Sequence, residues 1–485
     1  MVEKLVIRPV EARDIKNIFE LSNDDEVRAV SIHQKKIKWD EHTKWFEKVR
    51  NDANVAFYVA ETAAGDFVGQ IRFVNENENW IVSISLVKKY RGRSLGKIFL
   101  RQAMMQFPLR RFTAYVMPEN TSSQRMFLVL GYKQTGQKII NGRTYFVFEY
   151  DPVFIIAEMS ANHCGDKNLA KKIIKTAKEI GADAVKIQTY TADTITLNCH
   201  NPEFKVSGTK LWNDKYLYDL YQEACTPWEW QGELKAYADT VGIPLFSTPF
   251  DFSAVDFLET LDVPMYKIAS FEAFDYPLIK YAAGRGKPMI ISTGISSLEE
   301  MQETVDSCKA VGNNDITLLK CTSAYPAEPG DMNLLTIQDM IKRFGPQGVK
   351  IGLSDHSMSI VPPVVAVALG AKVIEKHFTL DRALGGADSG FSLNPEEFAA
   401  MVKAVRETEA SLGSVDYTVN EQNRKFARSL YVVKDIKKGE VFTSENIRSV
   451  RPSNGLHPRY YEQVMGRTAV RDLPFGTPLS LKDVN

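Results

Sequence analysis

Eight short apolar runs recur between residues 153 and 410, and stretches with helical periodicity separate them. Each run has the length and composition of a buried β-strand. Eight parallel strands that alternate with helices over about 260 residues are typical of a (β/α)8 barrel. The predicted strands are residues 154–158, 184–188, 244–248, 265–270, 289–293, 316–321, 350–355 and 372–377.

The segments on either side of this barrel follow other patterns. Residues 1–151 alternate strand-like and helical stretches, and Asp151-Pro152 interrupts the chain before the first barrel strand. Residues 411–425 are polar and predict a linker, whereas short strand-like runs and turn signals such as Lys438-Gly439 predict a small β-rich domain after it. We therefore expect an α/β protein with domains at residues 1–151, 152–410 and 426–485.

Composition and charge narrow the choice of partners and compartment. Of the 485 residues, 44% are hydrophobic and 25% are charged, and 60 Lys and Arg residues balance 60 Asp and Glu residues. Neither nucleic acid nor an acidic membrane is expected as a partner, and no signal peptide or membrane-spanning run is predicted. The five cysteines show no CxxC spacing, so we expect reduced thiols in a cytoplasmic protein.

Two histidines close consecutive predicted strands. His356 ends the run that reads KIGLSDH, His377 ends the run that reads KVIEKH, and a helical stretch lies between them. Consecutive strands of a βαβ unit would bring both imidazoles to the C-terminal face of the barrel, where such folds keep their chemistry. Two neutral imidazoles are half of a plausible metal site. The alternative is two unrelated polar strand ends.

Charged residues also interrupt the other apolar runs. Glu158 ends the first predicted strand, and Lys186 and Lys267 lie inside the second and fourth. Lysines are rarely buried without a partner. They could pair structurally with carboxylates, for which the candidates are Glu158, Glu272 and Asp251. In the functional interpretation they bind a small dianion, with hydroxyl donors from Ser270, Ser292 and Ser354.

A strand, a turn of small residues and a helix follow one another in residues 84–107 of the first domain. This arrangement forms an anion cradle, because backbone N–H groups and the helix dipole both point at a phosphate. Residues 91–96 and 120–132 resemble the two conserved blocks of the GNAT family of acetyl-CoA-dependent N-acetyltransferases. Residues 37–46 and 69–73 are similar to GNAT enzymes of bacterial nonulosonate pathways, which acetylate the 4-amino group of a nucleotide-linked sugar.

The GNAT resemblance implies a binding site for acetyl-CoA, formed by Leu86, Val87, Arg91, Gly92, Arg93, Ser94, Leu95, Gly96, Lys97 and Asn120. Two positions depart from the family pattern. Ser94 replaces a glycine of the pyrophosphate loop, and Phe127 replaces the tyrosine that protonates the leaving thiolate in many members. Tyr132 or Tyr145 are candidates for that acid. The alternative is a non-catalytic module that binds acyl-CoA or supports oligomerisation, while a capping role is the alternative for Asn120.

The barrel strings AEMSANH, AVKIQT, YKIAS, STGIS, CTSAYP, GLSDHS and EKHF resemble the sialic acid synthase family. Its members condense phosphoenolpyruvate with an amino sugar to give a nine-carbon 2-keto acid. The SANH and ADSGFSL strings are most similar to pseudaminic acid synthases, whose sugar is 2,4-diacetamido-2,4,6-trideoxy-L-altrose. Ala387 departs from the family, where many members have proline.

This resemblance assigns roles to residues across the barrel. His356 and His377 would hold Mn²⁺ or Mg²⁺. Glu158, Glu272 and Asp388 would be catalytic, although which carboxylate handles which proton stays open. The substrate-binding residues would be Lys186, Gln188, Lys267, Ser270, Ser292, Tyr325 and Ser354.

The last segment resembles the antifreeze-like (SAF) domain that ends these synthases, in residues 429–440 and 451–455. In the family this domain crosses a homodimer and covers the partner's barrel, and Arg451 matches an arginine that contacts the sugar's N-acetyl group. The alternative is an ordinary surface arginine before a turn.

The resemblances together imply a bifunctional enzyme in which an acetyltransferase precedes a pseudaminic acid synthase. One alternative is a legionaminic or N-acetylneuraminic acid synthase with a non-catalytic GNAT-like module. Another is a structural barrel with a carbohydrate-binding SAF domain, which would leave the paired histidines and the buried lysines unexplained.

Overall fold

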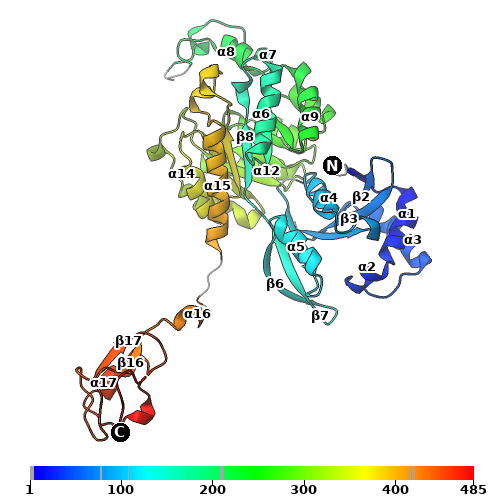
Figure 1. The fold of residues 1–485 in the computed structure, drawn as a ribbon. Coiled ribbons are helices and arrows are strands. Elements are labelled where there is room, and N and C mark those ends of the chain that lie inside the picture. Colours follow the sequence, from blue (N-terminus) through cyan, green and yellow to red (C-terminus); the bar gives the residue numbers. More distant parts are fainter. Residues whose placement is uncertain are drawn as a thin grey trace. The chain divides into compact units, whose positions relative to one another are not determined.

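The computed structural model describes residues 5–76, 79–107, 109–207, 212–413, 417, 419 and 421–485. The chain forms two compact units, Met1–Leu412 and Gly413–Asn485. The first unit contains a mixed sheet and a closed barrel (Figure 1). The predicted linker, residues 411–425, lies partly outside the described residues, and within it α16 (Glu421–Arg424) is helical.

The N-terminal domain is built on a seven-stranded sheet in the order β1-β2-β3-β4-β5-β7-β6. Its strands are β1 (Leu5–Pro9), β2 (Val55–Thr62), β3 (Phe67–Glu76), β4 (Asn79–Leu86), β5 (Arg111–Val116), β6 (Lys133–Ile140) and β7 (Arg143–Tyr150). The helices are α1 (Ile15–Ser22), α2 (Asp25–Ala29), α3 (Trp39–Arg50), α4 (Leu95–Met104) and α5 (Thr121–Val129).

The neighbouring strands β4 and β5 are parallel, and their pairing is short. It runs from Asn79 opposite Arg111 to Ile81 opposite Thr113 and then stops. Beyond it, the C-terminal half of β4 pairs only with β3 among the described strands. The two strands therefore part and leave backbone groups of β4 available to a ligand.

Alternate residues of β3 face opposite sides of the sheet. Ile71 and Phe73 are fully buried in a core that α4 closes with Phe99. A second, smaller core lies among Ile18 of α1, Phe46 of α3 and strand β2. Helices therefore cover both faces of the sheet.

The eight predicted strands are present and close into a parallel barrel in which β15 pairs with β8. They are β8 (Phe154–Glu158), β9 (Ala184–Thr189), β10 (Leu245–Pro249), β11 (Tyr266–Ile268), β12 (Met289–Ser292), β13 (Ile316–Cys321), β14 (Lys350–Asp355) and β15 (Val373–His377). The helices of this domain are α6 (Lys167–Glu179), α7 (Ala192–Ile195), α8 (Leu217–Ala224), α9 (Trp228–Val241), α10 (Phe252–Thr260), α11 (Tyr276–Ala283), α12 (Leu298–Ala310), α13 (Thr336–Phe344), α14 (Val361–Ala368) and α15 (Pro395–Leu412).

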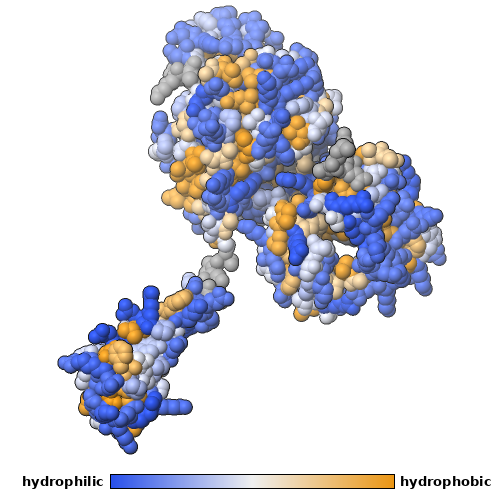
Figure 2. All heavy atoms as spheres, viewed as in Figure 1, coloured by the Kyte–Doolittle hydropathy of each residue, from blue (hydrophilic) through white to orange (hydrophobic). Residues whose placement is uncertain are grey.

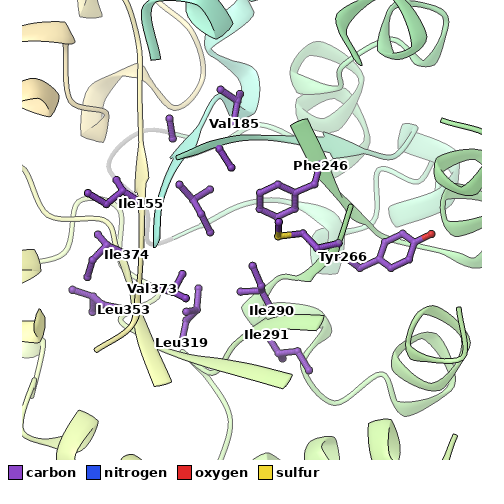
Figure 3. Packing of buried hydrophobic residues seen from close by; sticks show 14 of the residues in the cluster. Ile155, Val185, Phe246, Tyr266, Ile290, Ile291, Leu319, Leu353, Val373 and Ile374 are labelled. Carbon is purple, nitrogen blue, oxygen red and sulfur yellow. The ribbon is translucent and has the colours of Figure 1, made fainter. Parts of the chain in front are cut away.

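The barrel strands are apolar on both faces because helices cover the outside and side chains fill the inside. Figure 3 shows side chains of several strands within this core, among them Ile155, Val185 and Phe246. The core needs a small residue at Gly352, where a Cβ atom would lie 2.4 Å from the Val373 carbonyl oxygen.

The C-terminal unit is small and β-rich, as predicted. Strands β16 (Ser429–Val432) and β17 (Ile447–Val450) are antiparallel, and isolated bridges extend the pairing. One short helix, α17 (Tyr461–Val464), follows them. Its core gathers Leu430, Val432, Ile436, Phe442, Ile447, Val464, Ala469, Leu473 and Leu479.

The surface of the described chain is largely hydrophilic on the side shown in Figure 2, with apolar atoms in small scattered groups. No helix among the described residues has the length and apolar character that a membrane span requires.

Candidate active site

Polar side chains at the C-terminal ends of the barrel strands lie in rows that the strand register sets. His377 of β15 lies beside Glu158 of β8, and Glu158 lies beside Lys186 of β9. In a neighbouring row, Ser354 of β14 lies beside Glu375 of β15. Residues at the same level of adjacent parallel strands point to the same side of the sheet, so these side chains share the barrel interior.

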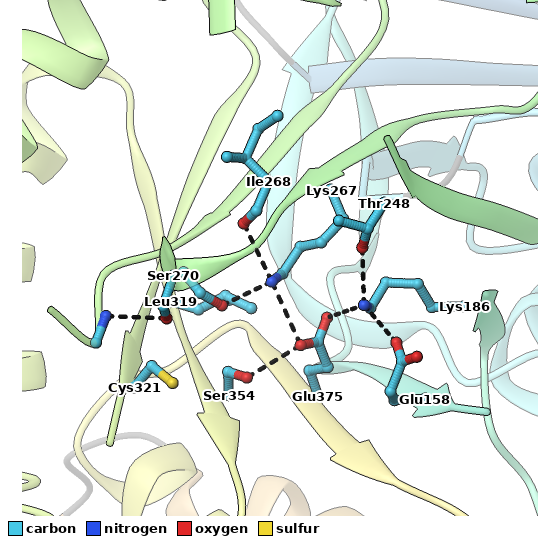
Figure 4. A network of polar contacts seen from close by, with 12 residues as sticks. Glu158, Lys186, Thr248, Lys267, Ile268, Ser270, Leu319, Cys321, Ser354 and Glu375 are labelled. Atoms are coloured by element: carbon cyan, nitrogen blue, oxygen red, sulfur yellow. Dashed lines mark hydrogen bonds and ion pairs between the residues drawn. The ribbon is translucent and has the colours of Figure 1, made fainter. Parts of the chain in front are cut away.

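Two lysines and two carboxylates form a network there (Figure 4). Lys186 Nζ forms an ion pair with Glu158 and donates a hydrogen bond to Thr248 Oγ1 at 2.9 Å. Glu375 lies between the lysines, with Oε2 3.9 Å from Lys186 Nζ and Oε1 3.4 Å from Lys267 Nζ. All four charged side chains are at most 5% exposed. Because water does not solvate these buried charges, the lysines and the carboxylates must neutralise one another.

The hydroxyl groups named from the sequence complete this network. Ser292 Oγ accepts a hydrogen bond from Lys267 Nζ at 2.7 Å, and Ser354 Oγ donates to Glu375 Oε1 at 3.0 Å. Ser270 Oγ accepts from the Gly294 backbone N–H at 3.1 Å. Hydroxyls reorient readily, so these groups can turn to donate to a bound anion.

Two residues of the network escaped the sequence analysis. Glu375 lies two positions before His377 in the same strand, so the period of two that turns His377 inward also turns Glu375 inward; that signal was present in the sequence. Cys321 was grouped with the other cysteines, but its Sγ lies 3.9 Å from His356 Nδ1. Although burial opposes it, contact with His356, Ser270 and Lys267 lowers the pKa of Cys321 to about 7.

The two histidines lie at the ends of neighbouring strands, with ring centroids 5.3 Å apart. His356 Nδ1 donates a hydrogen bond to the Thr322 carbonyl at 3.0 Å, which leaves its Nε2 available to a metal. His377 Nδ1 is buried without a hydrogen-bond partner. Burial holds the pKa of His377 well below 6.5, so this imidazole is neutral.

These features fit a divalent metal ion with two imidazole ligands. The described residues contain no cluster of three or more His, Cys, Asp and Glu side chains with ligand geometry. Oxygen atoms of a substrate or of water would therefore have to complete the coordination, which is the open type of site found in catalytic centres.

The carboxylates Asp388 and Glu272 come from segments that follow the strands. Asp388 accepts a hydrogen bond from Ser160 Oγ, and Gln188 Nε2 donates to the same hydroxyl at 3.0 Å. Burial raises the pKa of Asp388. Glu272 Oε2 is buried without a hydrogen-bond partner, and burial raises the pKa of this carboxyl to about 7. Glu272 can therefore hold a proton near neutral pH.

Aromatic rings line one side of the histidine pair. The centroid of Tyr325 lies 4.4 Å from that of His356, and Phe391 lies 4.7 Å from His377. Trp212 lies 5.5 Å from Tyr325, and its Nε1 donates to the Ala387 carbonyl at 3.0 Å. The sequence analysis named Tyr325 but neither Phe391 nor Trp212, since their proximity depends on loops from different parts of the chain.

In the N-terminal domain, residues 91–96 run from the end of a short 3-10 helix (Lys88–Tyr90), which follows β4, into the first turn of α4. Gly92 has φ 75° and Ser94 has φ 63°. Ser94 therefore adopts the left-handed conformation that glycine favours, and it occupies the N-cap position of α4 without a side-chain capping hydrogen bond. The first N–H groups of α4 lie at its N-terminal end, where the helix itself offers them no acceptor.

The predicted CoA ligands have different surroundings. Arg91 donates to the Leu86 carbonyl at 2.8 Å and forms ion pairs with Asp24 and Glu26, so it fixes the loop. Arg93 is exposed. Asn120 caps α5 by accepting a hydrogen bond from the Ser123 N–H at 3.2 Å, as the structural alternative predicted.

The two tyrosine candidates for the acid of the acetyltransferase, Tyr132 and Tyr145, are buried, and so is Phe127, which has no hydroxyl. Phe127 packs in the core, with its ring centroid 4.9 Å from that of Tyr132. Tyr132 directs its hydroxyl to Met104 Sδ at 3.3 Å. Tyr145 is 1% exposed, and its hydroxyl has no hydrogen-bond partner. Of the two tyrosines, Tyr145 is therefore the one whose hydroxyl is available to donate a proton.

Arg451 belongs to the C-terminal unit, where it directly follows β17 and is exposed.

Comparison with known proteins identifies the family to which this chain belongs. A protein-family model described as the NeuB family matches residues 173–417. The pseudaminic acid synthase of Campylobacter jejuni is 49% identical over 334 residues, which are 68% of this chain and 96% of that protein. The chain belongs to the NeuB family.

Other NeuB relatives are less similar. The N,N'-diacetyllegionaminic acid synthase of Legionella pneumophila is 35% identical over 335 residues, or 67% of this chain and 93% of that protein. The crystal structure of an N-acetylneuraminic acid synthetase from Leptospira borgpetersenii has 31% identity and a TM-score of 0.51, and the match covers 60% of this chain and 95% of that one.

The flanking domains also match family models. The acetyltransferase (GNAT) domain matches residues 4–133, and the SAF domain matches residues 427–485. The predicted order of a GNAT domain, a parallel barrel and a SAF domain is thereby confirmed.

The NeuB barrel should become less stable as Glu272 loses its proton. The pKa of Glu272 is about 7 in the folded protein and 4.5 for an ordinary glutamate, so between these values the folded chain retains a proton that the unfolded chain releases. The contribution of this proton to the free energy of unfolding is complete below pH 4.5 and is lost as the pH rises to 7. Glu272→Gln should flatten this slope in urea unfolding of the full chain. An unchanged slope, equal to that of exposed Glu203→Gln, would contradict the assignment.

The GNAT loop should bind the CoA pyrophosphate through its backbone and through Arg93. Arg93→Glu places a carboxylate beside that anion, so the affinity for CoA should fall about tenfold or more. Calorimetric titration of the full chain measures the change, and Lys48→Glu, at an exposed position on α3, matches the change in charge. An equal loss of CoA affinity in both variants would show a general electrostatic effect, and the CoA site would then lie elsewhere.

Proposed function

We propose that the barrel condenses phosphoenolpyruvate with 2,4-diacetamido-2,4,6-trideoxy-L-altrose to form pseudaminic acid and phosphate. The observation that carries this proposal is the buried pair of lysines, Lys186 and Lys267, beside two histidines at one barrel mouth. The choice of sugar rests on the 49% identity to a pseudaminic acid synthase, against 35% for a legionaminic acid synthase.

In this proposal the lysine network binds the phosphate and carboxylate of phosphoenolpyruvate. Lys186 and Lys267 supply positive charge, and Ser270, Ser292 and Ser354 supply hydroxyl donors. Glu375 holds the two ammonium groups near each other before the substrate arrives, which limits the reorganisation that binding requires.

His356 and His377 would hold the divalent metal, and Tyr325 would pack beside the sugar. When bound, the metal supplies Lewis-acid polarisation of the sugar aldehyde. The fixed orientation of His356, whose Nδ1 is bonded to the Thr322 carbonyl, presents one ring nitrogen to the site.

The reaction forms a bond between C3 of phosphoenolpyruvate and the aldehyde carbon, which leaves positive charge at C2. In this proposal Glu158, Asp388 and Glu272 face the reacting centre, and whichever of them is ionised stabilises that charge. Water adds to C2 and gives up a proton, the aldehyde oxygen gains one, and the C2–O bond to phosphate breaks. The carboxyls with raised pKa values, Asp388 and Glu272, are suited to these proton transfers.

Incubation of the protein with phosphoenolpyruvate, Mn²⁺ and a panel of 2-acetamido sugars tests the proposal. Pseudaminic acid, identified by mass and NMR, should be the preferred product. Preference for the legionaminic or N-acetylneuraminic precursor would change the proposed sugar substrate and leave the proposed type of reaction unchanged.

We further propose that the GNAT domain transfers an acetyl group from acetyl-CoA to an amino sugar linked to a nucleotide. The parting of β4 from β5 and the anion-binding loop before α4 support this role. Release of free CoA with a 4-amino sugar nucleotide tests it. Tight binding of acetyl-CoA without turnover would favour the non-catalytic alternative.

Arg451 should act across a homodimer by covering the partner's barrel and excluding water from a cationic intermediate. Mixing inactive Arg451→Ala protein with inactive His356→Ala protein should then restore activity, since one mixed site has both residues intact. Subunit exchange is verified first by tagged pull-down. If exchange occurs and no activity returns, Arg451 acts within its own chain or is dispensable.

A further inference from the structure

A further buried ion pair lies on the outer side of the two barrel strands that carry the histidines. Lys376 of β15 and Asp355 of β14 pair in register, and their charged groups form an ion pair in which both side chains are fully buried. Because alternate residues of a strand face opposite sides of a sheet, this pair faces the surrounding helices, while His356 and His377 face the barrel interior. The ion pair therefore adjoins the candidate metal site without belonging to it.

The ammonium group of Lys376 bonds mainly to the segment that follows His356. Its Nζ donates to the backbone carbonyls of Ser357 at 2.5 Å and Ser359 at 3.1 Å, and it lies 3.2 Å from Ser357 Oγ. Asp355 Oδ1 accepts a hydrogen bond from the Ser357 backbone N–H at 2.8 Å. Both backbone groups of Ser357 are thus bonded to the ion pair, which ties the chain just after His356 to β15.

The two histidines differ in how their rings are held. His356 Nδ1 donates to the Thr322 carbonyl, whereas His377 Nδ1 has no hydrogen-bond partner among the described residues. A metal-ligating histidine is normally oriented by such a bond from its second ring nitrogen. In its place, His377 has the contact with Phe391 and the course of its own backbone. Lys376, the residue before it, joins that backbone to the segment after His356.

Stability alone is a poor explanation for this ion pair. Removal of an ammonium and a carboxylate from water is costly, and apolar residues of similar volume often stabilise a fold as well as a buried ion pair does, or better. Apolar residues cannot, however, donate hydrogen bonds to two backbone carbonyls. The specific contribution of Lys376 is therefore the geometry that it imposes on the segment 357–359.

We propose that Lys376, paired with Asp355, is a positioning residue that sets the separation and orientation of His356 and His377 for a divalent metal ion. The two ring centroids are 5.3 Å apart, and ligands of a metal must be held within about 0.5 Å of the productive geometry. Lys376 acts through the backbone, because its side chain faces away from the metal and the substrate. This inference rests on the metal assignment in the function proposed above.

Titration of the metal-free full chain with Mn²⁺, with the free ion measured by electron paramagnetic resonance, tests the inference. The double variant Asp355→Asn with Lys376→Met removes both charges together, so its melting temperature should stay close to that of the unsubstituted protein. The amide oxygen can still accept the Ser357 N–H, but nothing replaces the donor to the two carbonyls. Mn²⁺ affinity should fall about tenfold to a hundredfold. The absorption spectrum of bound Co²⁺ should also change, since it reports the arrangement of the ligands.

The control variant removes a similar ion pair at the N-terminal ends of β8 and β9. Arg406 pairs with Asp183 and donates to the Val153 carbonyl at 2.6 Å, and Asp183 accepts the Ile155 N–H at 2.9 Å. Asp183→Asn with Arg406→Met therefore removes the same kinds of contact from the other end of the barrel. It should leave both the Mn²⁺ affinity and the Co²⁺ spectrum unchanged.

Lys376→Arg decides the question if the double variant does not fold. It keeps the ion pair, but its larger planar group displaces the carbonyls of Ser357 and Ser359, so Mn²⁺ affinity should fall several-fold and the Co²⁺ spectrum should change. Unchanged affinity and spectrum in the folded variants, or an equal loss in the control variant, would overturn the inference.

Two further outcomes separate the inference from the proposed function. Absence of Mn²⁺ binding by the unsubstituted protein would overturn the metal assignment and the inference together. Weaker Mn²⁺ binding by the Lys376 variants, with no condensation by the unsubstituted protein, would leave the inference intact and reject the proposed reaction.

Discussion

His377→Ala is expected to abolish phosphate release from phosphoenolpyruvate, with a loss of about a thousandfold or more. The variant removes one of two imidazoles in a site that has no third protein ligand among the described residues, so metal affinity should collapse. His356→Ala and treatment with a chelator should have the same effect, and added Mn²⁺ should restore only the chelated protein.

The control for this experiment is His200→Ala, which removes an exposed histidine whose ring lies 4.4 Å from Tyr216, remote in sequence from both strand ends. It should retain full activity and metal affinity. Direct metal titration separates loss of the ion from loss of the fold, which thermal unfolding also monitors. Full activity in metal-free His377→Ala protein would reject the metal assignment.

Lys267→Met is expected to weaken phosphoenolpyruvate binding about a hundredfold. The substitution removes a cation from a fully buried site and leaves Glu375 with Lys186 as its remaining cation. Removing one partner of a buried ion pair also destabilises a fold by about 3–5 kcal/mol. Binding and stability must therefore be measured in the same variants.

The double variant Lys267→Met with Glu375→Gln separates these two effects. It restores the balance of charge, so most of the lost stability should return, whereas the affinity for phosphoenolpyruvate should remain low. Lys171→Met on the outer helix α6, which breaks an ion pair with Glu233, is the surface control. If the double variant regained substrate affinity, Lys267 would have a structural role alone.

Much of the fold could be predicted from the sequence because its signals are local. Each barrel strand is a short apolar run, and each βα unit repeats the alternation of strand and helix. The adjacency of His356 and His377 followed from the same logic, since consecutive parallel strands joined by one helix are neighbours in a barrel. The family strings then identified the lysines and serines that the structure brings together.

Pairings between distant segments were beyond such signals. The hydrogen bond from Ser160 to Asp388 joins residues 228 positions apart, and it depends on barrel closure between β15 and β8. The sequence analysis assigned Arg91 to CoA, but the ion pairs with Asp24 and Glu26 show that this side chain also anchors the loop to α2 and its cap.

The sequence by itself determined the order of the domains, the number of barrel strands and the two strand ends that carry histidine. Only the tertiary structure decided which charges share a counter-ion, as Glu375 does between Lys186 and Lys267 in the barrel. The physical reason is the distance along the sequence between the residues that interact. Hydrophobic periodicity is written in neighbouring residues, whereas the energy of a buried charge depends on every group that folding brings within a few ångströms of it.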